Sequence, residues 1–274
     1  MNRLFVVNKP VFISSNFYLN RVKRKYKNKK AGFSGTLDPF ACGCLVVAFG
    51  QYSKLFRFLK KTPKAYRTTI WLGAKSESLD IENVYYIKEV KNLDINIIKK
   101  ELLNLKGELE YLPPKFCAKK IDGRRAYDMA RAGEEFKLNK IKSNIYDIKF
   151  INYNHPFITF DITVSEGSYI RSIAQELLLK LNQEGTLSYL ERLYEGEFYF
   201  DNEKSLNPIK YIDLPIINYT GTKEWFDMGK KLSREYFDTQ KDGEYLVVFD
   251  TFFAIVEIKG DEVKYILNKI LLEK

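Results

Sequence analysis

The stretch AGFSGTLDPFACGCL, residues 31–45, holds a single carboxylate, Asp38, among three glycines and one proline. Glycine and proline set tight turns, and glycine lets a large ligand approach the backbone closely. Aspartate also caps turns with its own side chain. The stretch therefore leaves two interpretations of Asp38 open, a catalytic carboxylate and a turn cap. The apolar residues at 44–49 predict a buried strand directly after it.

The most basic run of the chain lies just before this stretch. Seven of the ten residues at 21–30, RVKRKYKNKK, are Lys or Arg. Like charges this close repel one another unless an anion offsets them, which favours a nucleic-acid contact over a solvated helix face. The net charge of +10 agrees with a polyanionic partner but proves little alone, because the whole chain is rich in Lys.

Length and hydrophobic periodicity predict the fold class. With 274 residues, 45% of them hydrophobic, the chain can form one large globular domain with a smaller one. Apolar patterning and turn residues predict strands at 4–8, 44–49 and 66–72, helices at 16–27, 52–60, 94–105 and 169–181, a strand-like region at 145–164, and short strands at 245–249, 252–258 and 263–267. We therefore expect an α+β protein with a small β-rich C-terminal segment.

Composition also excludes several classes. No segment approaches the run of about 18 apolar residues that crosses a bilayer, and the N-terminus does not read as a signal peptide, so we expect a soluble, cytoplasmic protein. Cys42, Cys44 and Cys117 lack the spacing of a disulfide framework or a zinc site and are expected to be reduced core residues. The single histidine, His155, is expected in a turn. Acid-base or nucleophilic chemistry must then fall mainly on Asp, Glu, Tyr or Lys.

A second unusual segment is SEGSYIRS at 165–172. If Ser168 caps a helix, Arg171 stands at the third helical position, where the helix dipole opposes a cation by about 0.3–1 kcal/mol. A carboxylate or a phosphate would offset this cost, because the planar guanidinium binds both. A plain surface arginine is the alternative.

Five segments, in the same order, resemble motifs of the bacterial tRNA pseudouridine synthase B (TruB) family. They are NKPVFISSN at 8–16, GFSGTLDPFACGCL at 32–45, KAYRTTIWLGAKSESLD at 64–80, LPPKFCAKKIDGRRAYDMARAG at 112–133 and VSEGSYIRSIAQEL at 164–177. The resemblance implies the pseudouridine synthase fold over 1–215, with a mixed, mainly antiparallel central sheet and flanking helices. It also implies a short β-rich, PUA-like RNA-binding segment over 220–274.

The resemblance assigns roles to particular residues. Asp38 matches the catalytic nucleophile, and Arg171 matches an arginine that pairs with it. Tyr66 matches a tyrosine expected to stack on the target uracil, and Asp80 an aspartate of the active-site polar network. Phe33 stands where many members have His, so it can stack but cannot donate a hydrogen bond. No metal or organic cofactor is implied.

The implied activity is conversion of uridine 55 in the T arm of tRNA to pseudouridine, with the base flipped out of its stack. The N-terminal motif departs from the family at Asn8, usually Asp, and Phe12, usually Gly. We expect a monomer that contacts the T stem-loop through Lys9, Arg21, Lys23, Arg24, Lys119, Lys120 and Arg124. Two alternatives stay open, a pseudouridine synthase acting on another RNA and a non-catalytic RNA-binding or tRNA-folding protein.

Overall fold

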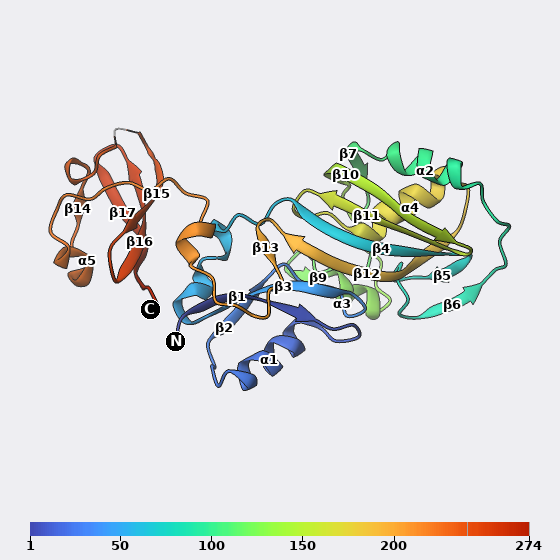
Figure 1. Cartoon of the computed structure of the whole chain (residues 1–274), viewed down its shortest axis with the longest axis horizontal. Coiled ribbons are helices and arrows are strands. Elements are labelled where there is room, and N and C mark those ends of the chain that lie inside the picture. Colours follow the sequence, from blue (N-terminus) through green and yellow to red (C-terminus); the bar gives the residue numbers. More distant parts are fainter. Residues whose placement is uncertain (240, 274) are drawn as a thin grey trace.

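The computed structural model of the chain describes residues 1–239 and 241–273. Its largest element is a nine-stranded sheet whose main path runs β1-β3-β12-β4-β11-β10-β7, with β2 paired to β3 and β13 paired to β12 (Figure 1). These strands are β1 (Arg3–Lys9), β2 (Ala31–Ser34), β3 (Cys42–Phe49), β4 (Lys64–Leu72), β7 (Gly107–Tyr111), β10 (Ile141–Asn154), β11 (Phe157–Val164), β12 (Gly185–Glu195) and β13 (Phe198–Tyr199).

β3 is an inner strand of this sheet. The β3 sequence CGCLVVAF is buried almost throughout, as expected for a strand covered on both faces. β3 pairs in parallel with β12, and the other pairs of the sheet are antiparallel. A Cβ at Gly43 would lie 2.3 Å from the carbonyl oxygen of Arg192, so this parallel contact requires glycine. The expected α+β class with a mixed, mainly antiparallel sheet is confirmed.

Helices cover the sheet at two places. α2 (Ile95–Leu103) and α4 (Ile170–Lys180) share one apolar core with the half of the sheet around β4, β10 and β11. α1 (Ser15–Lys25) packs Leu19 and Val22 against β1 and β3 in a separate core. The basic face of α1 therefore points away from the sheet toward solvent.

The helix expected at 52–60 is not an α-helix. The structure has two 3₁₀ turns there, Gly50–Lys54 and Phe56–Phe58. Tyr52, Leu55 and Phe58 are all buried and stand three residues apart. Because a 3₁₀-helix has three residues per turn, this spacing places all three on one face, which an α-helix of 3.6 residues per turn does less well.

The C-terminal segment forms a sheet of its own, at the left of Figure 1, in the order β14-β17-β16-β15. It comprises β14 (Leu232–Ser233), β15 (Gly243–Val248), β16 (Phe252–Lys259) and β17 (Glu262–Leu271), preceded by α5 (Glu224–Met228). Leu246, Phe253 and Ile255 of this sheet share a buried core with Leu4 and Val46 of β1 and β3. The C-terminal sheet is therefore packed against the larger one.

Candidate active site

Asp38 lies in the loop between β2 and β3, and contacts on both sides fix that loop. The Ser15 hydroxyl accepts a hydrogen bond from the Leu37 amide and donates one to the Leu37 carbonyl, both at 2.9 Å. On the other side of Asp38, the Lys9 ammonium donates to the Pro39 carbonyl at 3.2 Å. The backbone that carries the carboxylate is thus held before and after it.

Arg171, at the start of α4, meets Asp38. Its Nε lies 2.9 Å from Asp38 Oδ2, and its side chain is 3% exposed against 34% for Asp38. Nη1 donates to the Ser78 carbonyl at 2.6 Å and lies 3.2 Å from Asp80 Oδ2. Nη2 donates to the Phe116 carbonyl at 2.8 Å. Arg171 is therefore a buried cation shared between two carboxylates, and a plain surface position is excluded.

The start of α4 differs from the expectation. The N-cap is Tyr169, which makes no side-chain cap bond, so Arg171 is the second residue of the helix rather than the third. Ser168 instead donates its hydroxyl to the Ser165 carbonyl at 2.9 Å. The condition that Ser168 caps the helix is therefore not met, because its hydroxyl closes the preceding turn. The carboxylates around Arg171 offset the unfavourable helix dipole.

Asp80 is the second carboxylate that contacts Arg171. Its Oδ1 accepts hydrogen bonds from the Ser78 hydroxyl at 2.6 Å and from the Glu82 amide at 3.0 Å. Burial raises the pKa of Asp80 from 3.8 to about 6, because desolvation of the charged form outweighs stabilisation by Ser78 and Arg171. Asp80 is thus an ionisable group that titrates below neutral pH.

This raised pKa makes stability depend on pH. Between pH 4 and pH 6 the folded state binds more protons at Asp80 than the unfolded state does, so the free energy of unfolding falls as pH rises through that window. The total loss from this group is about 3 kcal/mol, complete above the folded pKa. Urea midpoints at pH 4.5 and 6.5 test this: the wild type should lose more stability over the interval than Asp80→Asn. Equal slopes would contradict it.

Two cavities meet at Asp38. The larger, of about 720 Å³, is lined in part by Phe33 and Asp80, and the smaller, of about 380 Å³, by Tyr66. Asp38 and Arg171 line both. Tyr66 is 8% exposed and lies in β4. The structure thus brings all five predicted active-site side chains to one place, while their roles stay predictions.

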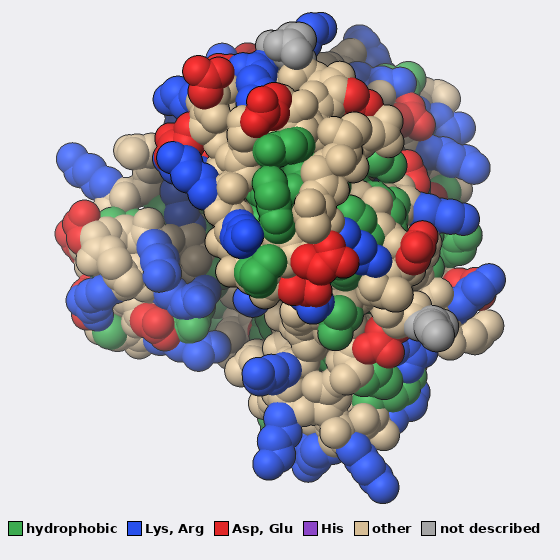
Figure 2. Space-filling model, turned by 90° about the vertical axis from the view of Figure 1, so that its left-hand side faces the viewer, with side chains coloured by type: hydrophobic (Ala, Val, Ile, Leu, Met, Phe, Trp, Pro, Cys, Tyr) green, Lys and Arg blue, Asp and Glu red, His purple; other side chains and the backbone are tan. Residues whose placement is uncertain are grey.

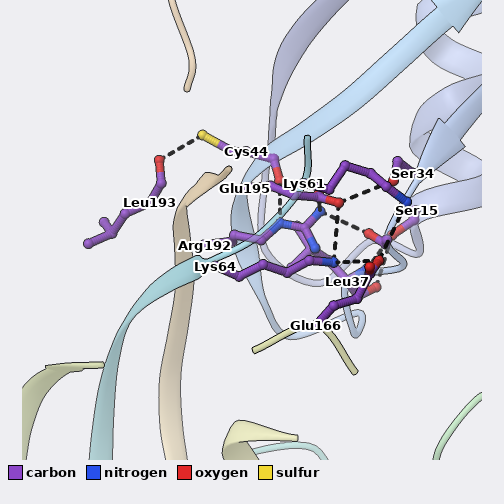
Figure 3. Close-up of polar contacts among 11 residues, drawn as sticks. Ser15, Ser34, Leu37, Cys44, Lys61, Lys64, Glu166, Arg192, Leu193 and Glu195 are labelled. Atoms are coloured by element: carbon purple, nitrogen blue, oxygen red, sulfur yellow. Dashed lines mark hydrogen bonds and ion pairs between the residues drawn. The ribbon is translucent and has the colours of Figure 1, made fainter. Parts of the chain in front are cut away.

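A buried set of charges lies close to the loop between β2 and β3 (Figure 3). Lys64 Nζ is 3.2 Å from Glu195 Oε1, and Arg192 Nη2 is 3.3 Å from Glu195 Oε2. The side chains of Arg192 and Glu195 are at most 1% exposed. The register between β4 and β12 sets these neighbours, because Lys64 pairs with Glu195 and Tyr66 pairs with Arg192. The charge set therefore joins β12 to β4, the strand that carries Tyr66.

The same charge set forms hydrogen bonds with the loop that carries Asp38. Ser34 donates its hydroxyl to Glu195 Oε1 at 3.1 Å. Arg192 donates to the Gly35 carbonyl and, through Nε, to the Cys44 carbonyl, both at 2.8 Å. A Cβ at Gly35, whose φ is +62°, would lie 3.0 Å from Arg192 Nη1. Gly35 thus allows the loop to turn tightly over the guanidinium.

The predicted RNA contacts divide into surface residues and one buried residue. Arg21, Lys23 and Arg24 lie on α1, and Figure 2 shows Lys and Arg side chains projecting from the lower end of the molecule, where Figure 1 places α1. Lys9 was expected to contact RNA, and this was wrong. It is fully buried, its ammonium donates to three loop carbonyls, and burial lowers its pKa to about 8. It holds the loop that carries Asp38 instead.

The remaining predicted contacts lie near the cavities. Lys119 lines the smaller cavity, and Lys120 is exposed in the two-residue strand β8 (Lys120–Ile121). Arg124 in β9 (Arg124–Arg125) forms a two-pronged ion pair with Glu134, with both N–O distances at 2.8 Å. An RNA phosphate would have to compete with this carboxylate for Arg124.

Two arginines that face the site were missed. Arg125 and Arg131 line the larger cavity with Asp38, whereas Arg124 does not. Arg131 ends the short helix α3 (Ala126–Arg131). Alternation of side chains along a strand was the available signal, because Arg124 and Arg125 in β9 must point to opposite sides. Sequence alone did not say which of the two faces the cavity.

The structure also locates the three cysteines and the single histidine. Cys42, Cys44 and Cys117 are free thiols, and Cys44 and Cys117 are buried. His155 lies in the turn between β10 and β11. Residues 1–239 and 241–273 contain no group of three or more His, Cys, Asp or Glu side chains placed to hold a metal ion. Within the same ranges no helix has the length and apolar character needed to cross a lipid bilayer.

Known proteins similar to this chain agree with the motifs. A family model described as TruB family pseudouridylate synthase (N terminal domain) matches residues 23–170. A protein named tRNA pseudouridine synthase B from Sulfurovum sp. (strain NBC37-1) is 54% identical over 270 residues, covering 98% of each chain. A protein of the same name from Campylobacter curvus (strain 525.92) is 51% identical over 273 residues, covering 98% of this chain and 99% of its own.

Solved structures show the same fold. The crystal structure of a Cbf5-Nop10-Gar1 complex aligns with a TM-score of 0.69 at 16% identity, covering 97% of this chain and 84% of that chain. A structure of an H/ACA RNP bound to a substrate RNA aligns with a TM-score of 0.64 at 15% identity, covering 99% and 85%. These likenesses show the fold alone. The family model and the relatives that match over nearly the whole length show that the chain belongs to the TruB family of pseudouridylate synthases.

Proposed function

We propose that the chain is a tRNA pseudouridine synthase that isomerises uridine 55 in the T arm of tRNA. The observation that carries this proposal is the carboxylate of Asp38, paired with the buried Arg171 at the junction of two cavities, one of them lined by Tyr66. Relatives named tRNA pseudouridine synthase B, about half identical over nearly the whole chain, support the choice of substrate.

The reaction is an isomerisation that needs no redox partner. The bond from ribose C1′ to uracil N1 breaks, the base rotates, and C1′ bonds to C5; the C5 proton leaves and N1 gains one. Asp38 supplies the carboxylate, which either attacks the nucleotide or deprotonates the sugar. Arg171 fixes the carboxylate through Nε at 2.9 Å. In this reaction Tyr66, which lines the smaller cavity, stacks on the uracil and accepts or relays the C5 proton.

RNA binding uses the basic surface around the cavities. Arg21, Lys23 and Arg24 on α1, with Lys119 and Lys120 near the smaller cavity, contact phosphates of the stem-loop. Single-stranded loops suit this mode of recognition, because their bases can be splayed out. Phe33 stacks beside the flipped nucleotide. Residues 220–274 act as a PUA-like segment that adds affinity, and the protein acts as a monomer in the cytoplasm.

The proposal is tested by tritium release from C5-labelled uridine in an unmodified tRNA transcript. A matched transcript with cytidine at position 55 serves as the control. Release from the first transcript only would support both activity and site. Release from both would move the target to another uridine, and release only from a different RNA would favour the alternative substrate. Tight binding without any release would favour a non-catalytic RNA-binding protein.

A further inference from the structure

The loop between β1 and α1, together with the first turn of α1, exposes two aromatic rings. Phe12 is 66% exposed and Phe17 is 50% exposed. With Val11 and Arg21 they line a surface hollow of about 560 Å³. The Arg21 guanidinium carbon lies 5.1 Å from the centroid of the Phe17 ring. Apolar rings left in water beside a cation are typical of a binding surface rather than of a core.

The backbone of Phe12 is also unusual. Its φ is +57°, a left-handed conformation that glycine adopts freely and bulky residues rarely do. The loop is held in place, since Lys9 Nζ donates to the carbonyls of Pro10 and Ile13 at 2.9 and 2.6 Å. The Ile13 amide donates to the Pro39 carbonyl at 3.2 Å, which ties this loop to the one carrying the catalytic carboxylate. Backbone strain kept in a well-anchored loop is characteristic of functional positions.

We propose that Phe12 and Phe17 form a stacking site for an unpaired base of the substrate RNA, separate from the pocket of the target uridine. This inference rests on the RNA substrate proposed above. Ser14 lines both this hollow and the larger cavity at Asp38, so the two sites adjoin. Every base has an aromatic face, so stacking needs no particular sequence. Arg21 adds a cation beside the ring, where it also meets the phosphate of the stacked nucleotide.

The surrounding charge favours RNA over an apolar protein partner. Arg21, Lys23 and Arg24 follow Phe17 on the same helix, and α1 has no acidic residue in its first turn. RNA has negative phosphates and, where it is single-stranded, bases with exposed aromatic faces. It therefore complements both the positive charge and the apolar area of this surface. A base stacked here lies next to the loop that positions Asp38, so its binding also fixes the RNA beside the active site.

Phe12→Gly separates stacking from stability. Glycine suits φ = +57°, so the variant should unfold at the wild-type temperature or above it. Loss of one stacked base should weaken binding of an RNA stem-loop by about 5- to 100-fold. Phe12→Tyr keeps the ring and should bind as the wild type does. Tyr199→Ala removes an equally exposed ring, 64% exposed in β13, and should leave affinity unchanged.

Abasic stem-loops identify the partner of Phe12. A series with one loop base removed at a time, keeping the target uridine, is titrated with wild type and with Phe12→Gly. Removing the base at one loop position should weaken binding by the wild type. On that abasic RNA, Phe12→Gly should cause no further loss of affinity. Wild-type affinity of Phe12→Gly for the intact RNA, or an equal loss on every RNA, would overturn the inference.

Tritium release by the wild type on the intact RNA distinguishes the two proposals. Tritium release without coupling between Phe12 and any base would contradict the stacking site alone. Coupling without tritium release would contradict the proposed catalysis but would still support the stacking site.

Discussion

Asp38→Asn is expected to lower tritium release by about 10²- to 10⁶-fold, a range that runs from the loss of a catalytic base to the loss of a nucleophile. Asparagine keeps the size of the side chain but removes the charged oxygen that, in the proposed reaction, attacks or takes a proton. RNA affinity should stay near that of the wild type, because Arg171 retains Asp80 as its second anion and the proposed phosphate contacts do not include Asp38. Single-turnover release and binding at one fixed salt concentration measure the two effects separately.

Asp122→Asn is the matched control for this variant. Asp122 is an exposed aspartate with a φ of +48°, which asparagine also tolerates. It should leave both release and binding unchanged. If Asp38→Asn kept release within about tenfold of the wild type, a loss below that of either a catalytic base or a nucleophile, another group would have to carry out the role proposed for Asp38.

Arg171→Met should unfold the protein at a much lower temperature and abolish turnover. It leaves the buried Asp80 carboxylate without its cation and leaves the Ser78 and Phe116 carbonyls without a donor. Breaking a buried ion pair costs about 3–5 kcal/mol. For a chain of this size that is a fall of about 6–20 °C in the unfolding midpoint. Differential scanning calorimetry measures it directly.

The double variant Arg171→Met with Asp80→Asn shows where that cost comes from. Removing the stranded charge should recover part of the lost stability, because the two residues are energetically coupled. Turnover should stay absent, since Asp38 still lacks its guanidinium. An Arg171→Met protein as stable as the wild type would mean that Asp80 has another partner once the arginine is gone.

Much of the fold was predictable because local patterns and tertiary contacts agree. The buried strand at 44–49, the C-terminal strands and the helix at 94–105 appear close to where apolar spacing places them. The region 52–60 was misjudged because its apolar residues are spaced by three. Ser168 does not cap α4, because a nearby carbonyl competes for its hydroxyl.

The site was predictable to a smaller extent. Asp38 and Arg171 attract notice as a carboxylate in a rigid turn and a cation at a helix start, and they lie together in the structure. The pairing of Lys64 with Glu195 depends on the register between strands about 130 residues apart in the chain, which no local pattern contains. Lys9 looked like a surface cation because sequence gives no sign that three carbonyls surround it.

The enclosed charges of Lys64, Arg192 and Glu195 limit how this sequence can drift during evolution. A change at one of these residues leaves its charged partner uncompensated. Replacing all three with an apolar set of similar volume leaves no charge unpaired, but the Ser34 hydroxyl and the Gly35 and Cys44 carbonyls then need new partners. Intermediates on the way between such states are the unstable ones. Directed evolution of this scaffold should therefore vary the three positions in one library, and single-site scans will score each of them as immutable.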